Sequence, residues 1–166
     1  MQAVVLCGGK GTRMSSTLGS TLPKLLTPLP EELGNHLLNN LLSCLERNGF
    51  ESVLLICGHN SSPIIEYIDS NSDRYSIKID IYVEDNPSGT ANALSQALDC
   101  IDEEFILIMG DLLISADLAR FARYCKSKES DLGLIVKSTD HPEDSDLVIV
   151  NSDWDCLLYT SDAADE

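Results

Sequence analysis

Residues 3–14 read AVVLCGGKGTRM, an apolar run followed at once by a glycine-rich segment that contains two basic residues. The apolar run predicts a buried β-strand at Ala3–Cys7. Glycines directly after a strand let backbone N–H groups approach a phosphate or a base without a Cβ in the way. The opening stretch therefore predicts a strand that leads into a loop for an anion.

Beyond this stretch, short apolar runs alternate with helix-like segments. Further strands are expected at Ser52–Cys57, Ile77–Val83, Phe105–Met109, Leu132–Lys137 and Leu147–Val150. Helices are expected at Asn35–Asn48, from Pro63 onward, at Thr90–Asp99 and at Asp117–Lys128. Asn35 is expected to cap the start of the first of these helices and Gly49 its end. Such alternation is typical of βαβ units and a mostly parallel sheet. Ligands of such sheets bind at the carboxyl ends of the strands.

Charge and hydropathy exclude several classes of partner. The net charge of −16 argues against nucleic acid and anionic membrane surfaces. Residues 1–30 nevertheless contain Lys10, Arg13 and Lys24 and none of the 27 acidic residues, which suggests a site for a small anion. The apolar runs are far shorter than the roughly 20 residues of a membrane span. Because the first residues also lack the basic start of a signal peptide, a cytoplasmic location is expected.

The C-terminal residues Cys156–Glu166 do not continue this pattern. Their sequence, CLLYTSDAADE, resembles the translation in one frame of a transposase-type sequencing-library adaptor. Segments of that kind are excluded from fold reasoning. We therefore expect one domain at residues 1–155, incomplete at its C-terminus, and a non-native tail at residues 156–166.

Two known phosphate-binding loops do not match the glycine-rich segment. A P-loop needs GxxxxGK[ST], and no such string occurs. The dinucleotide fingerprint of redox domains would start at Gly9 and has Met14 where a glycine or alanine is required. What remains is GGxGTRM followed by Pro23-Lys24. This combination resembles the signature of the sugar-1-phosphate nucleotidyltransferases, and the resemblance extends from Met1 to about Val150.

The resemblance implies a fold and a reaction. The fold is an α/β, Rossmann-like (GT-A-like) three-layer sandwich with a mostly parallel sheet, here truncated at its C-terminus. In the reaction, a sugar 1-phosphate attacks the α-phosphorus of an NTP and expels pyrophosphate, with Mg²⁺ as cofactor. The fragment as given is expected to have little activity, because the sugar pocket and a second metal-binding acid are expected in the part of the domain that would follow residue 155.

The resemblance also implies roles for single residues. Arg13 grips the β- and γ-phosphates, and Lys24 lies near the α-phosphate and the incoming sugar phosphate; both are catalytic candidates. Asp111 binds Mg²⁺. Glu84 falls where relatives place a polar residue that reads the base. The nucleotide-binding candidates are Leu6, Gly8, Gly9, Gly11, Thr12, Glu84, Gly89 and Thr90, and the sugar-binding candidates are Asn92 and Gly110.

One short segment bears on the identity of the substrates. Residues 141–148, HPEDSDLV, resemble a segment of nucleotidyltransferases linked to heptose 1-phosphate metabolism, some of them fused to a HAD-type phosphatase. This favours heptose or mannose 1-phosphate with GTP, ATP being another option, and such a fusion in the full-length protein. Thymidylyl-, uridylyl- and cytidylyltransferases stay open. A non-catalytic, sugar-nucleotide-binding regulatory subunit also stays open, although the joint presence of Arg13, Lys24 and Asp111 favours an enzyme.

Overall fold

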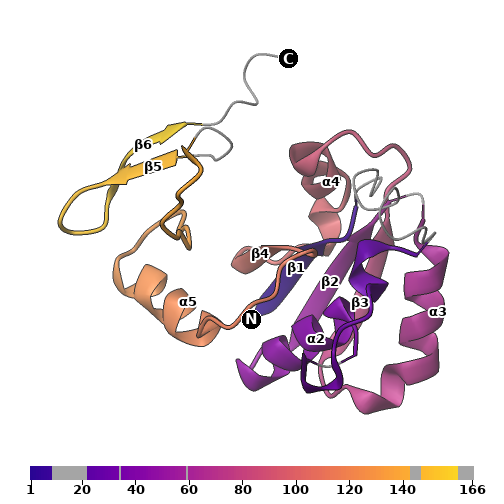
Figure 1. Cartoon of the computed structure of the whole chain (residues 1–166). Helices are drawn as coiled ribbons and strands as arrows, with labels where there is room; N and C mark the ends of the chain where they lie inside the picture. Colours follow the sequence, from indigo (N-terminus) through magenta and orange to yellow (C-terminus); the bar gives the residue numbers. More distant parts are fainter. Residues whose placement is uncertain (9–21, 34, 59, 143–146, 161–166) are drawn as a thin grey trace. The chain divides into compact units, whose positions relative to one another are not determined.

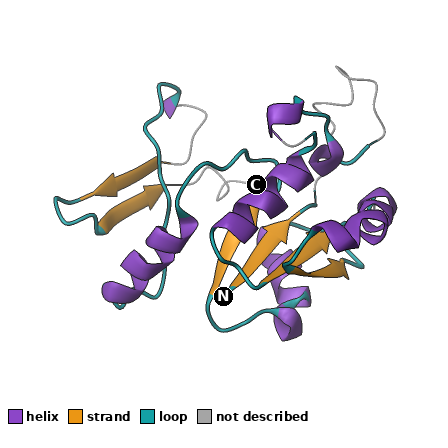
Figure 2. Ribbon diagram, turned by 90° about the horizontal axis from the view of Figure 1, so that it is seen from below, coloured by secondary structure: helices purple, strands orange, loops and turns teal. Residues whose placement is uncertain are grey.

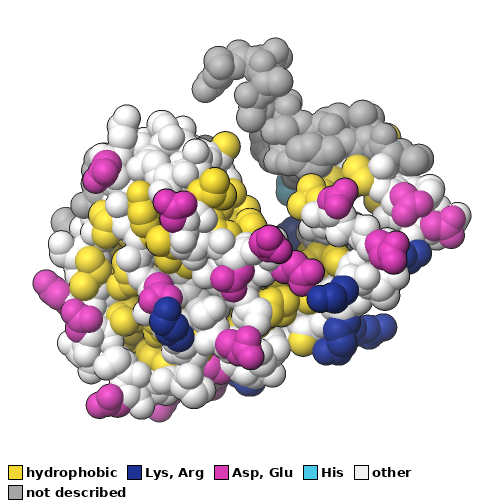
Figure 3. All heavy atoms as spheres, turned by 180° about the vertical axis from the view of Figure 1, so that it is seen from behind, with side chains coloured by type: hydrophobic (Ala, Val, Ile, Leu, Met, Phe, Trp, Pro, Cys, Tyr) yellow, Lys and Arg dark blue, Asp and Glu magenta, His cyan; other side chains and the backbone are white. Residues whose placement is uncertain are grey.

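The structure is a computed structural model that describes residues 1–8, 22–33, 35–58, 60–142 and 147–160. Residues 157–160 are described by their backbone alone. The chain forms two compact units, Met1–Tyr124 and Cys125–Glu166. Within the described residues, no helix combines the length and the apolar character that crossing a membrane requires. Acidic side chains are spread over the face drawn in Figure 3, in keeping with the negative net charge.

A four-stranded parallel sheet forms the centre of the first unit (Figure 1). Its strands are β1 (Gln2–Leu6), β2 (Ser52–Cys57), β3 (Lys78–Val83) and β4 (Phe105–Met109), in the order β3-β2-β1-β4. The register pairs Leu6 with Ile56 on one side and with Met109 on the other. The first four strands predicted from the apolar runs are thereby confirmed, with bounds that differ by one residue at most.

Helices cover both faces of this sheet, as the turned view in Figure 2 shows. On one face, α2 (Leu37–Arg47) and α3 (Ser62–Asn71) share a buried cluster with alternate strand residues such as Val5 and Leu55. On the other face, α4 (Thr90–Gln96) packs its Ala93 against a second cluster that contains Val4. The expected three-layer α/β sandwich is therefore present in the first unit.

Short 3-10 helices connect these elements: η1 (Lys24–Leu26), η2 (Glu31–Leu33), η3 (Ser72–Arg74) and η4 (Leu98–Cys100). The helix predicted at Thr90–Asp99 thus ends at Gln96 and is followed by η4. The helix predicted at Asp117–Lys128 is α5 (Leu118–Ser127), which contains the division between the two units.

Helix α2 begins one residue later than the sequence predicts. His36, not Asn35, holds the N-cap position, whereas Asn35 has a left-handed φ of 67°. The physical reason is an antiparallel bridge between Pro28 and His36, which keeps the backbone of His36 extended, so the helix begins only after it. At the other end the prediction is confirmed, because Gly49 follows the C-cap with a φ of 73°, a conformation that glycine adopts without steric cost.

The second unit contains an antiparallel pair, β5 (Leu147–Val150) and β6 (Cys156–Thr160). The predicted strand at Leu147–Val150 is confirmed, and its partner falls in the segment expected to be a non-native tail. The strand predicted at Leu132–Lys137 is wrong, because that segment is irregular and leaves Leu132 78% and Ile135 56% exposed. A strand forms only when a neighbouring strand pairs with its backbone, and apolar side chains alone do not supply one.

Candidate functional site at the carboxyl ends of the strands

The loops after the four strands meet at one edge of the sheet because all four strands run parallel. The chain places β2 and β3 on one side of β1 and then returns to place β4 on the other side. Open parallel sheets bind ligands at such a switch point, outside the carboxyl ends of the strands. The residues that follow β1 and β4 at this point are Cys7-Gly8 and Gly110-Asp111.

Lys24 and Asp111, which are 87 residues apart in the sequence, come together here. The Nζ atom of Lys24 at the start of η1 lies 3.0 Å from Oδ2 of Asp111, just after β4. The two side chains are 36% and 48% exposed, so the ion pair itself stabilises the fold by only about 0–1 kcal/mol. The pair brings together two of the predicted site residues, the lysine expected near the phosphates and the aspartate expected at the metal.

Glu84 and Gly8 also meet, although they follow different strands. Glu84 is 5% exposed, and a Cβ built on Gly8 would lie 3.3 Å from its Oε2 atom. The two loops approach each other across Gly58, whose Cβ would lie 3.9 Å from the Cα of Gly8 and 3.5 Å from Cγ of Pro87. Gly58 is not among the site residues predicted from the sequence. Its position directly after a strand is the feature that could have indicated it.

Helix α4 holds the loop that leads from Glu84 to the predicted residues Gly89 and Thr90. Asn92 donates from its Nδ2 to the carbonyl oxygen of Asn86 at 2.9 Å, and Gln96 accepts from the backbone N–H of Asp85 at 3.3 Å. Gly89 precedes the helix with a φ of 108°, a value that favours glycine strongly. Of the predicted residues, Gly89, Thr90 and Asn92 therefore lie on one braced segment that follows β3.

Gly110 lies in a space with no room for a side chain. A Cβ at this position would lie 2.7 Å from Cδ1 of Leu25 and 2.9 Å from the carbonyl oxygen of Leu6. The backbone N–H of Gly110 donates to that same carbonyl oxygen at 3.0 Å. Gly110 is buried, so the structure provides a packing reason for the glycine, and the predicted sugar contact stays a prediction.

We expect Gly110→Ala to lower the free energy of unfolding by about 1–3 kcal/mol, because the added methyl group overpacks the contact with Leu25 and Leu6. Gly58→Ala is the matched control, since its Cβ would meet Pro87 at 3.5 Å and Gly8 at 3.9 Å, which are ordinary contact distances. Urea unfolding of both variants measures the difference. Equal stability of the two variants would contradict the packing described at Gly110.

Cys7 lies between β1 and the glycine-rich segment, a position from which a reactive thiol could reach a bound ligand. Its pKa is raised well above the ordinary value by a hydrogen bond with Cys57, by burial and by the charge that Cys57 would carry. Its Sγ also donates to the carbonyl oxygen of Val5 at 3.5 Å. A thiol held protonated in this way packs as a small apolar group and is a poor nucleophile.

The donor chemistry at Asp111 fits a hard divalent cation such as Mg²⁺, which prefers carboxylate oxygens near substrate phosphates. Among the described residues, no three His, Cys, Asp or Glu side chains come together in a way that could hold a metal. The assignment of Asp111 as a metal ligand therefore stays a prediction, and in this structure its Oδ2 atom is paired with Lys24.

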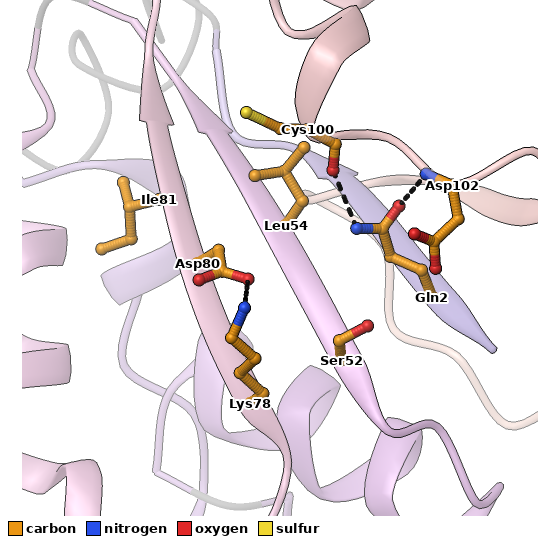
Figure 4. A pocket seen from close by; sticks show the side chains of 8 residues that line it. All are labelled: Gln2, Ser52, Leu54, Lys78, Asp80, Ile81, Cys100 and Asp102. Atoms are coloured by element: carbon orange, nitrogen blue, oxygen red, sulfur yellow. Dashed lines mark hydrogen bonds and ion pairs between the residues drawn. The ribbon is translucent and has the colours of Figure 1, made fainter.

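A hollow lies toward the opposite edge of the sheet, near the amino ends of β1, β2 and β3 (Figure 4). It has a volume of about 500 Å³ and contains none of the predicted site residues. Gln2 is occupied there, donating to the carbonyl oxygen of Cys100 at 3.0 Å and accepting from the N–H of Asp102 at 2.9 Å. Lys78 is paired with Asp80 at 2.7 Å. The two hydrogen bonds of Gln2 tie β1 to the segment before β4.

Four predicted residues lie outside the described part of the chain: Gly9, Gly11, Thr12 and Arg13. The same holds for residues 143–146 of the HPEDSDLV segment. Among the described candidates, the structure brings together Lys24 with Asp111, and Gly8 with Glu84. Leu6 ends β1, where its side chain is buried in the cluster that contains Ala93 of α4.

The sequence of residues 2–155 matches the family described as "Nucleotidyl transferase". The chain belongs to the nucleotidyl transferase family. The resemblance read from GGxGTRM and Pro23-Lys24 is thereby confirmed, and the loops described above are those of a nucleotidyl transferase. The matched range ends one residue before the segment expected to be a non-native tail.

Individual relatives of this nucleotidyl transferase differ in the base and sugar that their names give. The chain is 29% identical over 157 residues to the D-glycero-alpha-D-manno-heptose 1-phosphate guanylyltransferase of Campylobacter jejuni, covering 90% of this chain and 66% of that protein. It is 31% identical over 146 residues to the UTP–glucose-1-phosphate uridylyltransferase AglF of Haloferax volcanii, covering 87% and 57%. It thus spans two thirds or less of the length of these relatives.

A solved structure has the same fold. HddC from Yersinia pseudotuberculosis, complexed with GMP-PN, superposes with a TM-score of 0.74 at 23% sequence identity, covering 96% of this chain and 68% of that chain. At that identity the likeness concerns the fold, and it confirms the α/β architecture expected from the sequence.

Proposed function

We propose that this chain is the nucleotide-binding part of an enzyme that transfers a guanylyl group from GTP to a heptose or mannose 1-phosphate and releases pyrophosphate. The observation that carries the proposal is the pairing of Lys24 with Asp111 at the switch point of the sheet. Pyrophosphate release from a sugar 1-phosphate brings several negative charges together, so catalysis depends on positioning and charge neutralisation.

Each candidate residue has its own part in positioning the substrates and neutralising their charge. Lys24 donates to the α-phosphate and to the incoming sugar phosphate, which lowers the repulsion between them. Asp111 would hold Mg²⁺, which would supply positive charge to neutralise the phosphate oxygens. Arg13 uses its planar fork of donors to hold the β- and γ-phosphates and to stabilise the leaving pyrophosphate. Gly8, Gly9, Gly11 and Thr12 form the loop that receives the nucleotide.

The chemistry of Glu84 supports guanine as the base. A carboxylate only accepts hydrogen bonds, and its two oxygens can accept a parallel pair. Guanine offers two adjacent donors, N1–H and the N2 amino group, on its Watson–Crick edge. Uracil and thymine offer one N–H between two carbonyl oxygens, which repel a carboxylate. Glu84 is 5% exposed and lies beside Gly8, at the start of the nucleotide loop.

We expect Glu84→Gln to weaken GTP binding about 10- to 100-fold, because it removes a charge-assisted acceptor from both guanine donors. UTP binding should weaken much less, or improve, since the amide can donate to a uracil carbonyl. Asp85→Asn, at the adjacent exposed position, is the control. Calorimetric titration with both nucleotides measures the change. An equal loss for GTP and UTP would contradict base reading by Glu84.

The proposal is tested by the product of the complete gene. The source DNA is first read past the codon for Asp155, which also establishes whether residues 156–166 are native and whether a HAD-type phosphatase follows. The purified full-length protein is then given each of GTP, ATP, UTP, CTP and dTTP with heptose, mannose and glucose 1-phosphates, and pyrophosphate release is measured. Turnover with GTP and heptose or mannose 1-phosphate is expected; no turnover with any pair would favour a regulatory subunit.

Uridylyl transfer to glucose 1-phosphate is the second candidate, and the similarity to the uridylyltransferase of Haloferax volcanii favours it. The same panel distinguishes the two candidates, because a uridylyltransferase would release pyrophosphate from UTP and glucose 1-phosphate. The carboxylate of Glu84 argues for the guanylyl alternative, for the reason of donor and acceptor matching given above.

A further inference from the structure

The ion pair between Lys24 and Asp111 is too weak to determine by itself where these two residues lie. Both side chains are partly exposed, and an exposed pair between two mobile side chains contributes too little to hold two segments 87 residues apart in one place. A buried contact next to both residues is needed. Leu25 follows Lys24 and is 2% exposed, and the buried Gly110 precedes Asp111.

Leu25 and Gly110 lie directly against each other. The 2.7 Å separation between Cδ1 of Leu25 and a Cβ built on Gly110 means that the leucine occupies the space a side chain there would need. The hydrogen bond from Gly110 to Leu6 fixes this contact to the end of β1. Leu25 also belongs to the main buried cluster of the first unit, so its position is set by the core.

We propose that Leu25 is a positioning residue: by packing into the space left by Gly110, it sets the place of Lys24 relative to Asp111. The inference rests on the proposed function, since it concerns the groups that hold the substrate phosphates and the metal. It adds a residue that itself touches no substrate. Leu26 is the natural comparison, because it lies in the same turn and the same cluster and is 8% exposed, but is not among the atoms nearest to Gly110.

The first test compares Leu25→Ala with Leu26→Ala in the 166-residue chain, titrated with GTP in the presence of Mg²⁺. Both variants remove the same atoms from buried positions, so both lose thermal stability. We expect Leu25→Ala to weaken GTP binding about tenfold and Leu26→Ala less than about twofold, since misplacing a substrate-positioning group carries a large cost. Equal losses for the two variants would overturn the proposal.

A double-mutant cycle separates positioning from a general loss of structure. If Leu25 acts through Lys24, then Leu25→Ala should have almost no further effect on GTP binding in a Lys24→Gln background, because coupled residues are not additive. Full additivity would contradict the proposal. Should Leu25→Ala fail to fold, the Leu25→Val and Leu26→Val pair replaces it, and the same comparison applies.

A second readout needs no nucleotide and therefore remains valid if the proposed function fails. The side-chain ammonium signal of Lys24, assigned by its loss in Lys24→Gln, reports the ion pair by NMR. Leu25→Ala should move this signal toward that of solvent-exposed lysines, whereas Leu26→Ala should leave it unchanged. The signal of Lys78, which pairs with Asp80 at the other end of the sheet, is the internal reference. An unchanged Lys24 signal in Leu25→Ala would overturn the positioning role.

Discussion

Replacing Arg13 with alanine is expected to lower kcat in the full-length enzyme roughly 10²–10³-fold, a loss of about 2–4 kcal/mol of transition-state stabilisation. The reason is that negative charge on the leaving pyrophosphate grows in the transition state, and a guanidinium offers several donors in a fixed plane. The effect should fall mainly on kcat, because the interaction strengthens as the bond to the leaving group breaks.

The measurement is steady-state pyrophosphate release by wild type, Arg13→Ala and a control variant, Arg74→Ala. Arg74 is exposed in η3 and donates to Oδ1 of Asn71 at 3.0 Å, so its loss should leave turnover unchanged. Near-wild-type turnover of Arg13→Ala would refute the assigned role. An equal decrease in both variants would point to a general electrostatic effect of removing one positive charge.

Asp111→Asn is expected to have an effect of comparable size. The substitution keeps the shape of the side chain and removes its charge, so Lys24 loses its ionic partner. The metal site proposed at Asp111 would lose its carboxylate ligand as well. Charge stabilisation by a bound metal is worth several kcal/mol, so we expect turnover to decrease by about 10³-fold, or ~4 kcal/mol. Mn²⁺ binding in the presence of nucleotide, followed by electron paramagnetic resonance, should weaken in parallel.

Asp80→Asn is the matched control for this variant. It also removes the carboxylate of a lysine–aspartate pair at a partly exposed site, but at the amino ends of the strands. We expect unchanged turnover and unchanged Mn²⁺ binding. If Asp111→Asn keeps its metal affinity while losing turnover, Asp111 would act on Lys24 alone, and the metal ligand would have to lie elsewhere in the protein.

The elements of the first unit were predictable because their signals are local. Ser52–Cys57 and Phe105–Met109 are short apolar runs bounded by polar residues, and the structure has strands with these bounds. The leucines of α2 recur at helical spacing and are buried along one side. The failure at Leu132–Lys137 has the opposite cause: its composition resembles that of a strand, but strand formation depends on a partner that the segment itself does not contain.

The candidate site was predictable as a set of loops but not as a set of contacts. Glycine and acidic residues directly after strands indicate the carboxyl edge of a parallel sheet, so Gly8, Glu84 and Asp111 could be assigned to one edge from their positions alone. Nothing in the sequence indicates that Lys24 meets Asp111, or that Leu25 fills the space beside Gly110. These contacts depend on how η1 packs on the ends of β1 and β4.

The sequence by itself determined the family, the order of the strands and helices in the first unit, and the residues that carry charge at the nucleotide loop. These properties depend on motifs and on periodicity over a few neighbouring residues. Only the tertiary structure decided which distant residues touch: Lys24 with Asp111, Glu84 with Gly8, and Leu25 with Gly110. The physical reason is that such contacts arise from close packing of side chains between elements, which depends on the whole core and not on any one segment.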